Sequence, residues 1–171
     1  SYNTAVGSKA LFNNNTGPGN TANGYQALYS NTTAYLNTAN GYLALQDNTT
    51  GIGNIAVGGT ALNLNETGSN NTAIGDRALG TNITGSHNVA VGANAGISMF
   101  PLHGNYNTYI GDSATMQGNR INSTVIGSKA YTITNNSMVL GSINGVNGAT
   151  ADVKVGIGVT DPSEKLEIGK G

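Results

Sequence analysis

The side chains that could do chemistry in this 171-residue chain are few and lie far apart in the sequence. There are eight carboxylates and two histidines, and there is no cysteine. Asp76 and Asp112 hold equivalent positions of an internal repeat two copies apart, where stacking would separate them by about 10 Å. That separation is wide for an acid–base pair. Because no Ser-His-Asp order with a supporting motif and no phosphate-binding glycine loop accompanies them, we expect no enzyme and no cofactor.

Metal binding finds equally little support. In an oligomer with a threefold axis, His87 and His103 could each supply three imidazoles to a site on the axis. They form no His-x-His pair, however, and no cluster of carboxylates stands near them in the sequence. We therefore expect two solvated loop histidines and no metal.

Composition excludes several classes of partner. The net charge is −1 with only seven Lys and Arg residues, which is too few to follow a phosphate backbone, so we expect no nucleic acid. No apolar run approaches the roughly 18 residues of a membrane span, so we expect no membrane insertion by this segment. Charged residues make up 9% of the chain and aromatic residues 6%, which argues against a compact core of ordinary size.

A 17-residue repeat must position whatever site the chain has. A variant of Asn-Thr-Ala-x-Gly-x-x-Ala-Leu occurs five times in succession, and looser copies follow it. The five copies begin at Asn3, Asn20, Asn37, Asn54 and Asn71. A short, fixed period of this kind indicates stacked coils.

Each copy predicts strand, turn, strand and turn. In triplets such as Thr4-Ala5-Val6, Thr and Val face one side of a strand and Ala faces the other. The glycine that follows suits a tight bend, and we place the Ala-Leu pair after it, such as Ala27-Leu28, on the second strand. Stacking about 4.8 Å apart then gives a parallel β-solenoid of about nine coils and roughly 40 Å in length.

The coils offer too little apolar mass to enclose a thick core, which predicts self-association. Each has only Ala, one Val or Ile, and Leu, so the outward Val and Ile ladder gains free energy when it is covered. Three identical ladders can close around an axis, and we therefore expect a homotrimer. The axis residues would be Asn23, Asn40, Val57, Ile74 and Val91.

Asn23 and Asn40 replace the usual Val or Ile in two successive coils. On a threefold axis each would form a ring of three amides that holds water or an anion and enforces register at some loss of stability. The alternative is that this side of the coil is less buried.

Several runs resemble a known family. Asn-Thr-Ala-Val-Gly, Asn-Ile-Ala-Val-Gly, Asn-Val-Ala-Val-Gly and Ser-Thr-Val-Ile-Gly-Ser-Lys-Ala are similar to the head repeats of trimeric autotransporter adhesins, the YadA-like heads. The resemblance implies a left-handed parallel β-roll, one coil per repeat, in a homotrimer at the tip of a surface fibre. It covers residues 1–142. The family's repeats are usually a few residues shorter, so binding properties that depend on loop shape do not transfer.

Residues 143–171 read as a separate neck or junction segment. The run that ends in Asp161-Pro162-Ser163-Glu164-Lys165-Leu166 resembles the segment upstream of a C-terminal trimerisation chaperone in phage tail fibres. That resemblance implies a self-cleaving chaperone after Gly171. Asp161, Pro162 and Glu164 also fit the N-cap, N1 and N3 positions of a short helix. The alternative is an ordinary extended linker.

Two tyrosines form the first candidate binding surface. Tyr25 and Tyr42 occupy the same repeat position one coil apart, and this position is expected to be exposed because its residue type varies widely. Neighbouring Tyr rings beside Asn and Thr suit stacking against a sugar, whose apolar face they cover. The alternative, which we weigh more heavily, is that both rings pack against Tyr29 and Tyr35 to cover a neighbouring subunit.

A second candidate surface is the stretch 97–106, which breaks the 17-residue rhythm and gathers apolar residues. Insertions between coils often form binding loops, which makes Phe100, His103 and Tyr106 candidate ligand contacts. Alternatively, Met99, Phe100 and Leu102 pack across a subunit boundary.

We expect a non-enzymatic, extracellular fibre head, on a cell surface or a virion tail fibre, that recognises cell-surface glycans or a surface protein. A structural spacer is one alternative. An ice-binding solenoid is another, because Thr recurs at the first strand position, but Ile55 and Val89 interrupt that rank. A hexapeptide-repeat acyltransferase would need an 18-residue coil with an apolar residue every six, which this repeat does not supply.

Overall fold

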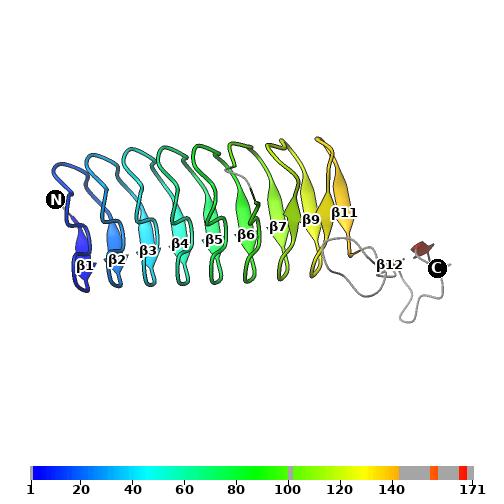
Figure 1. Cartoon of the computed structure of the whole chain (residues 1–171), viewed down its shortest axis with the longest axis horizontal. Helices are drawn as coiled ribbons and strands as arrows, with labels where there is room; N and C mark the ends of the chain where they lie inside the picture. The colour runs from blue at the N-terminus through cyan, green and yellow to red at the C-terminus, as the bar shows by residue number, and fades with distance from the viewer. Residues whose placement is uncertain (1, 100–101, 143–154, 158–165, 169–171) are drawn as a thin grey trace.

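The computed structural model describes residues 2–99 and 102–142, together with the backbone of residues 155–157 and 166–168. Within these residues the chain is all-β, and it contains no helix that is long and apolar enough to cross a membrane. Residues 2–99 and 102–142 wind into a parallel solenoid whose coils lie side by side in chain order (Figure 1). The prediction of an all-β parallel solenoid is therefore confirmed.

One nine-stranded parallel sheet runs along the solenoid, with one short strand from each coil. Its strands, in spatial and chain order, are β1 (Thr4–Val6), β2 (Thr21–Asn23), β3 (Thr38–Asn40), β4 (Ile55–Val57), β5 (Thr72–Ile74), β6 (Val89–Val91), β7 (Thr108–Ile110), β9 (Thr124–Ile126) and β11 (Met138–Leu140). Each strand follows its neighbour by one turn of the chain, so nine strands span about eight turns. The repeat sets the register, since Thr4 lies opposite Thr21 and Ala5 opposite Ala22.

The middle residue of each strand points into the solenoid. Ala22, Ala39 and Ala56 are fully buried, whereas the residues on either side of each Ala point outward. The predicted alternation, with Ala inside and Thr, Val or Ile outside, is confirmed. In the coils from β2 to β6 this inner position holds Ala, and Leu from the opposite wall fills most of the remaining interior.

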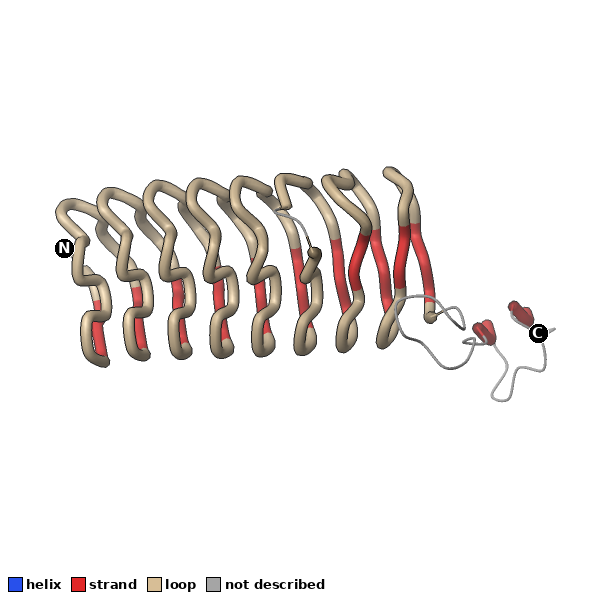
Figure 2. Tube along the Cα trace, viewed as in Figure 1, coloured by secondary structure: helices blue, strands red, loops and turns tan. Residues whose placement is uncertain are grey.

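The prediction of a second strand at the Ala-Leu pairs is wrong. The leucines lie in turns with positive φ between 50° and 52°, and the strands occupy only a short part of each coil (Figure 2). These leucines are Leu11, Leu28, Leu45, Leu62 and Leu79. The coils still bond to each other along this wall, because the Leu28 N–H donates to the Ala44 carbonyl at 3.0 Å.

Two strands do form on this wall near the end of the solenoid. β8 (Thr115–Met116) pairs in parallel with β10 (Tyr131–Thr132). Here Thr115 and Tyr131 follow the repeat Ala in place of Leu. β-Branched and aromatic residues favour extended backbone and resist positive φ, so the change of residue type converts the turn into a strand.

A column of glycines brings the coils into contact at the turn after each strand. Gly58 has a φ of 133°, and a Cβ at this position would collide with the carbonyl oxygen of Gly75 in the next coil. Backbone packs directly on backbone here, which explains the glycine in every copy of the repeat.

Two ladders of buried asparagines hold the coils together. In the first ladder, the Asn54 N–H donates to Asn37 Oδ1 at 2.9 Å, and Asn54 Nδ2 donates to the Gly68 carbonyl at 2.8 Å. The same pattern joins Asn20, Asn37, Asn54, Asn71, Asn88 and Asn107. Each amide thus satisfies a backbone group that stacking alone would leave without a partner.

The second ladder lies beside the first, because both donate to the same glycine carbonyls. Asn65 Nδ2 donates to Asn48 Oδ1 at 2.9 Å and to the Gly68 carbonyl at 2.9 Å. Among the described residues, no buried side-chain nitrogen or oxygen lacks a hydrogen-bond partner. Asparagine side chains therefore form part of the hydrogen-bonded interior of the solenoid as well as of its surface.

The tail is described only in part. β12 (Val155–Ile157) pairs in parallel with β13 (Leu166–Ile168). The helix start expected at Asp161, Pro162 and Glu164 lies outside the described residues.

Candidate functional site

The outer face of the nine-stranded sheet forms the first candidate surface, which we call the sheet face. It consists of the first and third residues of each strand in this sheet. Ile74 and Val91 are 42% and 37% exposed, although β-branched side chains normally pack against a partner layer. Within the described residues no further layer of the chain covers this face, so only a partner could remove these apolar side chains from water.

The five residues predicted to face a symmetry axis form one column on the sheet face. Strand pairing places Asn23 opposite Asn40, then Val57, Ile74 and Val91 in order. Asn23 Nδ2 donates to Asn40 Oδ1 at 3.2 Å, so the two amides pair along the column within one chain.

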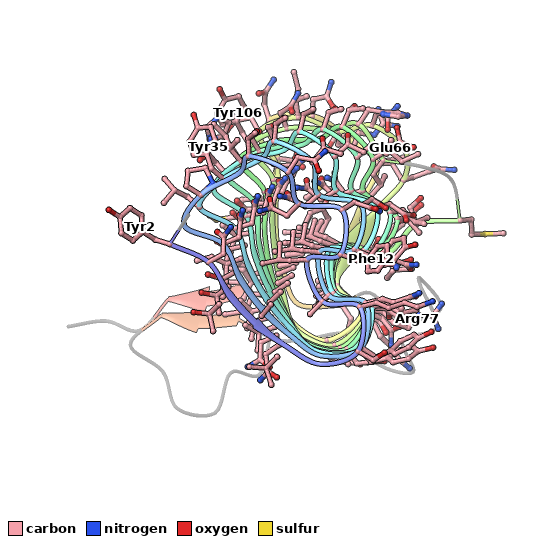
Figure 3. The ribbon with its side chains drawn as sticks, turned by 90° about the vertical axis from the view of Figure 1, so that its left-hand side faces the viewer. Tyr2, Phe12, Tyr35, Glu66, Arg77 and Tyr106 are labelled. Atoms are coloured by element: carbon pink, nitrogen blue, oxygen red, sulfur yellow. The ribbon has the colours of Figure 1, made fainter. Side chains whose placement is uncertain are left out.

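The opposite side of the coil carries the second candidate surface, the aromatic flank, which we define as Phe12, Tyr25, Tyr29 and Tyr42. In the view along the solenoid, Tyr2 lies on the strand side and Arg77 on the far side (Figure 3). The Arg77 position directly follows the position that Tyr25 and Tyr42 occupy in earlier coils. The flank and the sheet face therefore do not compete for the same contacts.

The tyrosines of the aromatic flank are stacked, and Tyr25 and Tyr42 are also exposed. The Tyr25 and Tyr42 rings have centroids 5.6 Å apart and planes inclined by 13°, and the side chains are 42% and 58% exposed. Tyr29 stacks instead on Phe12, with centroids 5.5 Å apart. Each pair follows the solenoid axis, since its members are 17 residues apart.

A chain of side-chain amides runs beside the stacked rings. Gln46 Nε2 donates to Gln26 Oε1 at 3.3 Å, and Asn63 Nδ2 donates to Gln46 Oε1 at 2.9 Å. Beyond Asn63 this position holds Gly80, where an open depression of about 240 Å³ begins. It is lined by Thr60, Asn63, Leu64, Arg77, Gly80, Thr81 and Ile97.

The remaining predicted contacts lie elsewhere. Tyr106 is 62% exposed and stacks on His87 with centroids 4.9 Å apart. His103 is exposed, and its Nδ1 lies 2.8 Å from Thr84 Oγ1. Figure 3 shows Tyr106 beside the corner of Tyr35 and away from Arg77, so the structure does not bring these residues together with the Tyr25 and Tyr42 pair.

The stretch 97–106 is a small insertion in one coil. Asn88 and Asn107 are 19 positions apart in the sequence, whereas the preceding repeat asparagines are 17 positions apart. Leu102 is buried and its N–H donates to the Thr81 carbonyl at 2.9 Å, whereas Met99 is 95% exposed. Phe100 lies outside the described residues.

The charged groups do not gather into a metal site in the part of the chain that the structure describes. No three His, Cys, Asp or Glu side chains there are grouped to hold a metal ion. Burial, and secondarily the negative charge of Glu66, raise the pKa of Asp47.

Two residues beside the aromatic flank were not anticipated as site residues. Gly59 and Asp76 occupy the same repeat position as Tyr25 and Tyr42, in the next two coils. The aligned repeats contain a sequence signal for them, because this position holds Tyr in two successive coils, then Gly59 and then Asp76.

Comparison with known proteins gives no family for this chain. No protein-family model matches it, and no curated protein matches its sequence.

Proposed function

We propose that the chain is the head of a trimeric, non-enzymatic adhesive fibre that recognises glycans or other ligands on a cell surface. In this proposal the solenoid is a left-handed β-roll, three copies pack through their sheet faces, and the assembly is extracellular. The fibre belongs to a cell surface or to a virion tail. The single observation that carries the proposal is the bare parallel sheet of nine strands.

The sheet face supports association because it is regular, uncovered and rich in exposed apolar side chains. Val6, Ile55, Ile74, Val89, Val91, Ile110, Met138 and Leu140 are all at least 37% exposed along it. Covering such a ladder gains about 25 cal/mol for each Å² of apolar surface removed from water. A closed arrangement around an axis also removes the flat surface on which an open stack of copies would grow.

The polar residues of the sheet face favour a specific register. Asn23 and Asn40 interrupt the apolar column at adjacent strands near one end of the sheet. Copies that align these amides leave none of them against Val or Ile, whereas a shifted copy buries an amide without a partner. This argument favours parallel, in-register copies, which is the arrangement that a fibre needs.

Ligand recognition is assigned to the aromatic flank because it stays open when the sheet face is covered. The flank combines stacked tyrosines with side-chain amides, which are the groups that bind the apolar face and the hydroxyls of a sugar. Three copies would present three such flanks, and multivalent contact strengthens weak individual binding.

The mass in solution tests the assembly. Light scattering should give three times the chain mass of 17.3 kDa. Ile74→Lys places a charge on the sheet face and should dissociate the trimer or lower its thermal midpoint. The matched control is Leu64→Lys, which is exposed to a similar degree (39% against 42%) but lies on the other side of the coil.

A stable monomer would contradict the proposal, and a trimer that withstands Ile74→Lys would place the interface elsewhere. Binding of the purified trimer to an array of cell-surface glycans tests recognition. A trimer that binds neither glycans nor cells would be a fibre spacer.

A further inference from the structure

The position next to Tyr42 is a gap in the aromatic flank. We propose that this gap, the Gly59 slot, binds one pyranose ring of a neutral glycan, with Tyr42 as one wall, Asp76 as the other and Gly59 as the floor. The inference rests on the proposed function, because it names the ligand class and the contact residues of the aromatic flank.

The backbone shows that the three residues are neighbours along the solenoid axis. The Thr60 N–H donates to the Tyr42 carbonyl at 2.7 Å, and the Arg77 N–H donates to the Gly59 carbonyl at 2.8 Å. Tyr42, Gly59 and Asp76 therefore follow each other in three successive coils. With strands about 4.8 Å apart, the Tyr42 and Asp76 positions are separated by about 10 Å.

Tyr42 offers an uncovered ring face to the slot. Tyr25, one coil earlier, stacks on the Tyr42 ring, and one coil later Gly59 supplies no side chain to cover it. Accordingly, Tyr42 is more exposed than Tyr25, at 58% against 42%. A phenol with one free face and a solvated hydroxyl binds the apolar face of a sugar ring.

Asp76 closes the slot on the other side. A methyl group built on Gly59 would lie 2.8 Å from Asp76 Oδ1, so the carboxylate leans over the glycine and back toward Tyr42. An ionised carboxylate only accepts hydrogen bonds, and its two oxygens can accept from two adjacent sugar hydroxyls. The negative charge also disfavours an acidic sugar in the same place.

The dimensions admit one sugar ring when the exposed Asp76 side chain turns back from Gly59 toward its own coil. Van der Waals contact takes about 4 Å from the tyrosine ring to the sugar carbons. A hydroxyl-to-carboxylate hydrogen bond takes about 2.7 Å more, which leaves no room in about 10 Å for a second stacked ring. Thr60 and Arg77, which follow Gly59 and Asp76, line the adjoining depression, so the glycan can continue there.

The repeat itself supplies the variant that tests the slot. Gly59→Tyr introduces at Gly59 the residue that Tyr25 and Tyr42 place at this position in the two preceding coils. The new side chain would meet only the flexible end of Asp76 within 4 Å of its Cβ. We therefore expect a filled slot and an unchanged thermal midpoint.

The experiment is a nuclear magnetic resonance titration of the whole chain with methyl pyranosides of glucose, galactose and mannose. At least one sugar should shift the Gly59 amide and Tyr42 ring signals and leave those of Tyr35 unchanged. Gly59→Tyr and Tyr42→Ala should each weaken binding about tenfold or more. Tyr35→Ala is the matched control, since Tyr35 is also exposed (42%) but lies at the other corner of the coil.

The inference is overturned if none of the three sugars shifts Gly59 or Tyr42, or if Gly59→Tyr binds as tightly as the parent chain. Its failure is distinguishable from that of the proposed function. Glycan-array binding that Gly59→Tyr leaves intact would retain the adhesive trimer and remove the slot. A monomer whose Gly59 signal shifts with a sugar would retain the slot and remove the trimer.

Discussion

The ring of Tyr109 lies against Gly96, across the narrow interior of the solenoid. A methyl group built on Gly96 would be 3.3 Å from Tyr109 Cδ2, and it would also approach Leu79 Cδ2 of the preceding coil at 2.8 Å. In the five preceding copies of the repeat, the inward strand residue is Ala and the residue that faces it is Leu. Here the two changes fall in successive coils: Gly96 leaves the wall of one coil without a large side chain, and the strand of the next coil supplies the Tyr109 ring beside it.

This exchange predicts strong coupling between the two positions. Tyr109→Ala should destabilise by about 3–5 kcal/mol, because it opens a cavity in the core. Gly96→Leu should destabilise by about 1–3 kcal/mol through overpacking, although its φ of 71° is close to that of the repeat leucines. The double variant restores the Ala and Leu arrangement, so chemical denaturation should give a favourable coupling energy of about 1–3 kcal/mol. Additive effects would refute the exchange.

The adjacent glycines Gly58 and Gly59 should differ in how much stability they lose on substitution by Ala. Gly58→Ala forces a Cβ into the backbone of the next coil at a φ of 133°, so we expect a loss of about 4 kcal/mol or more. Gly59→Ala is the control, since its Cβ meets only the Asp76 carboxylate and its φ is not in the left-handed range. Thermal melts of the two variants check this, and equal midpoints would show that the coils do not pack through their backbones.

Asp47 should make folding weakly dependent on pH. Its pKa is raised above 3.8, chiefly by burial and then by the charge of Glu66. The carboxyl group therefore favours folding fully below pH 3.8, and this contribution is lost as the pH rises through the higher pKa of the folded state. Asp47→Asn should gain stability relative to the parent at pH 7 compared with pH 3.

Denaturation of both proteins at the two pH values measures this effect. Glu66→Gln should change the pH dependence in the same direction but less, because the Glu66 charge is the smaller cause. A parent-to-variant difference that is the same at both pH values would contradict the assignment.

Local residue preference predicts the wrong backbone conformation for the wall opposite the sheet. Ala27-Leu28 looks extended in sequence, but Leu28 has a φ of 52° and lies in a turn. Left-handed backbone costs a residue with a Cβ about 1–2 kcal/mol, and only the burial of Leu28 in the core offsets that cost. Preference acts within a few residues, whereas this compensation comes from the next coil, 17 residues away.

The candidate contacts were also only partly readable in advance. The rank of Tyr25 and Tyr42 identifies two exposed rings one coil apart, and both are exposed and stacked. Side-chain directions at the turns decide two further contacts: Tyr29 stacks on Phe12, and the Asp76 carboxylate leans over Gly59. Those directions follow from backbone angles that the letters of the repeat do not specify.

The sequence by itself determined the stacking, the register and the two faces of the strands, because a fixed period makes equivalent residues neighbours and a strand alternates its sides. Tertiary structure alone decided the positive φ of the repeat leucines, the exchange between Gly96 and Tyr109, and the gap beside Tyr42. Each of these depends on contacts between different coils. Where one coil lacks a large side chain, the next coil either fills the space, as Tyr109 does beside Gly96, or leaves it open, as Gly59 does beside Tyr42.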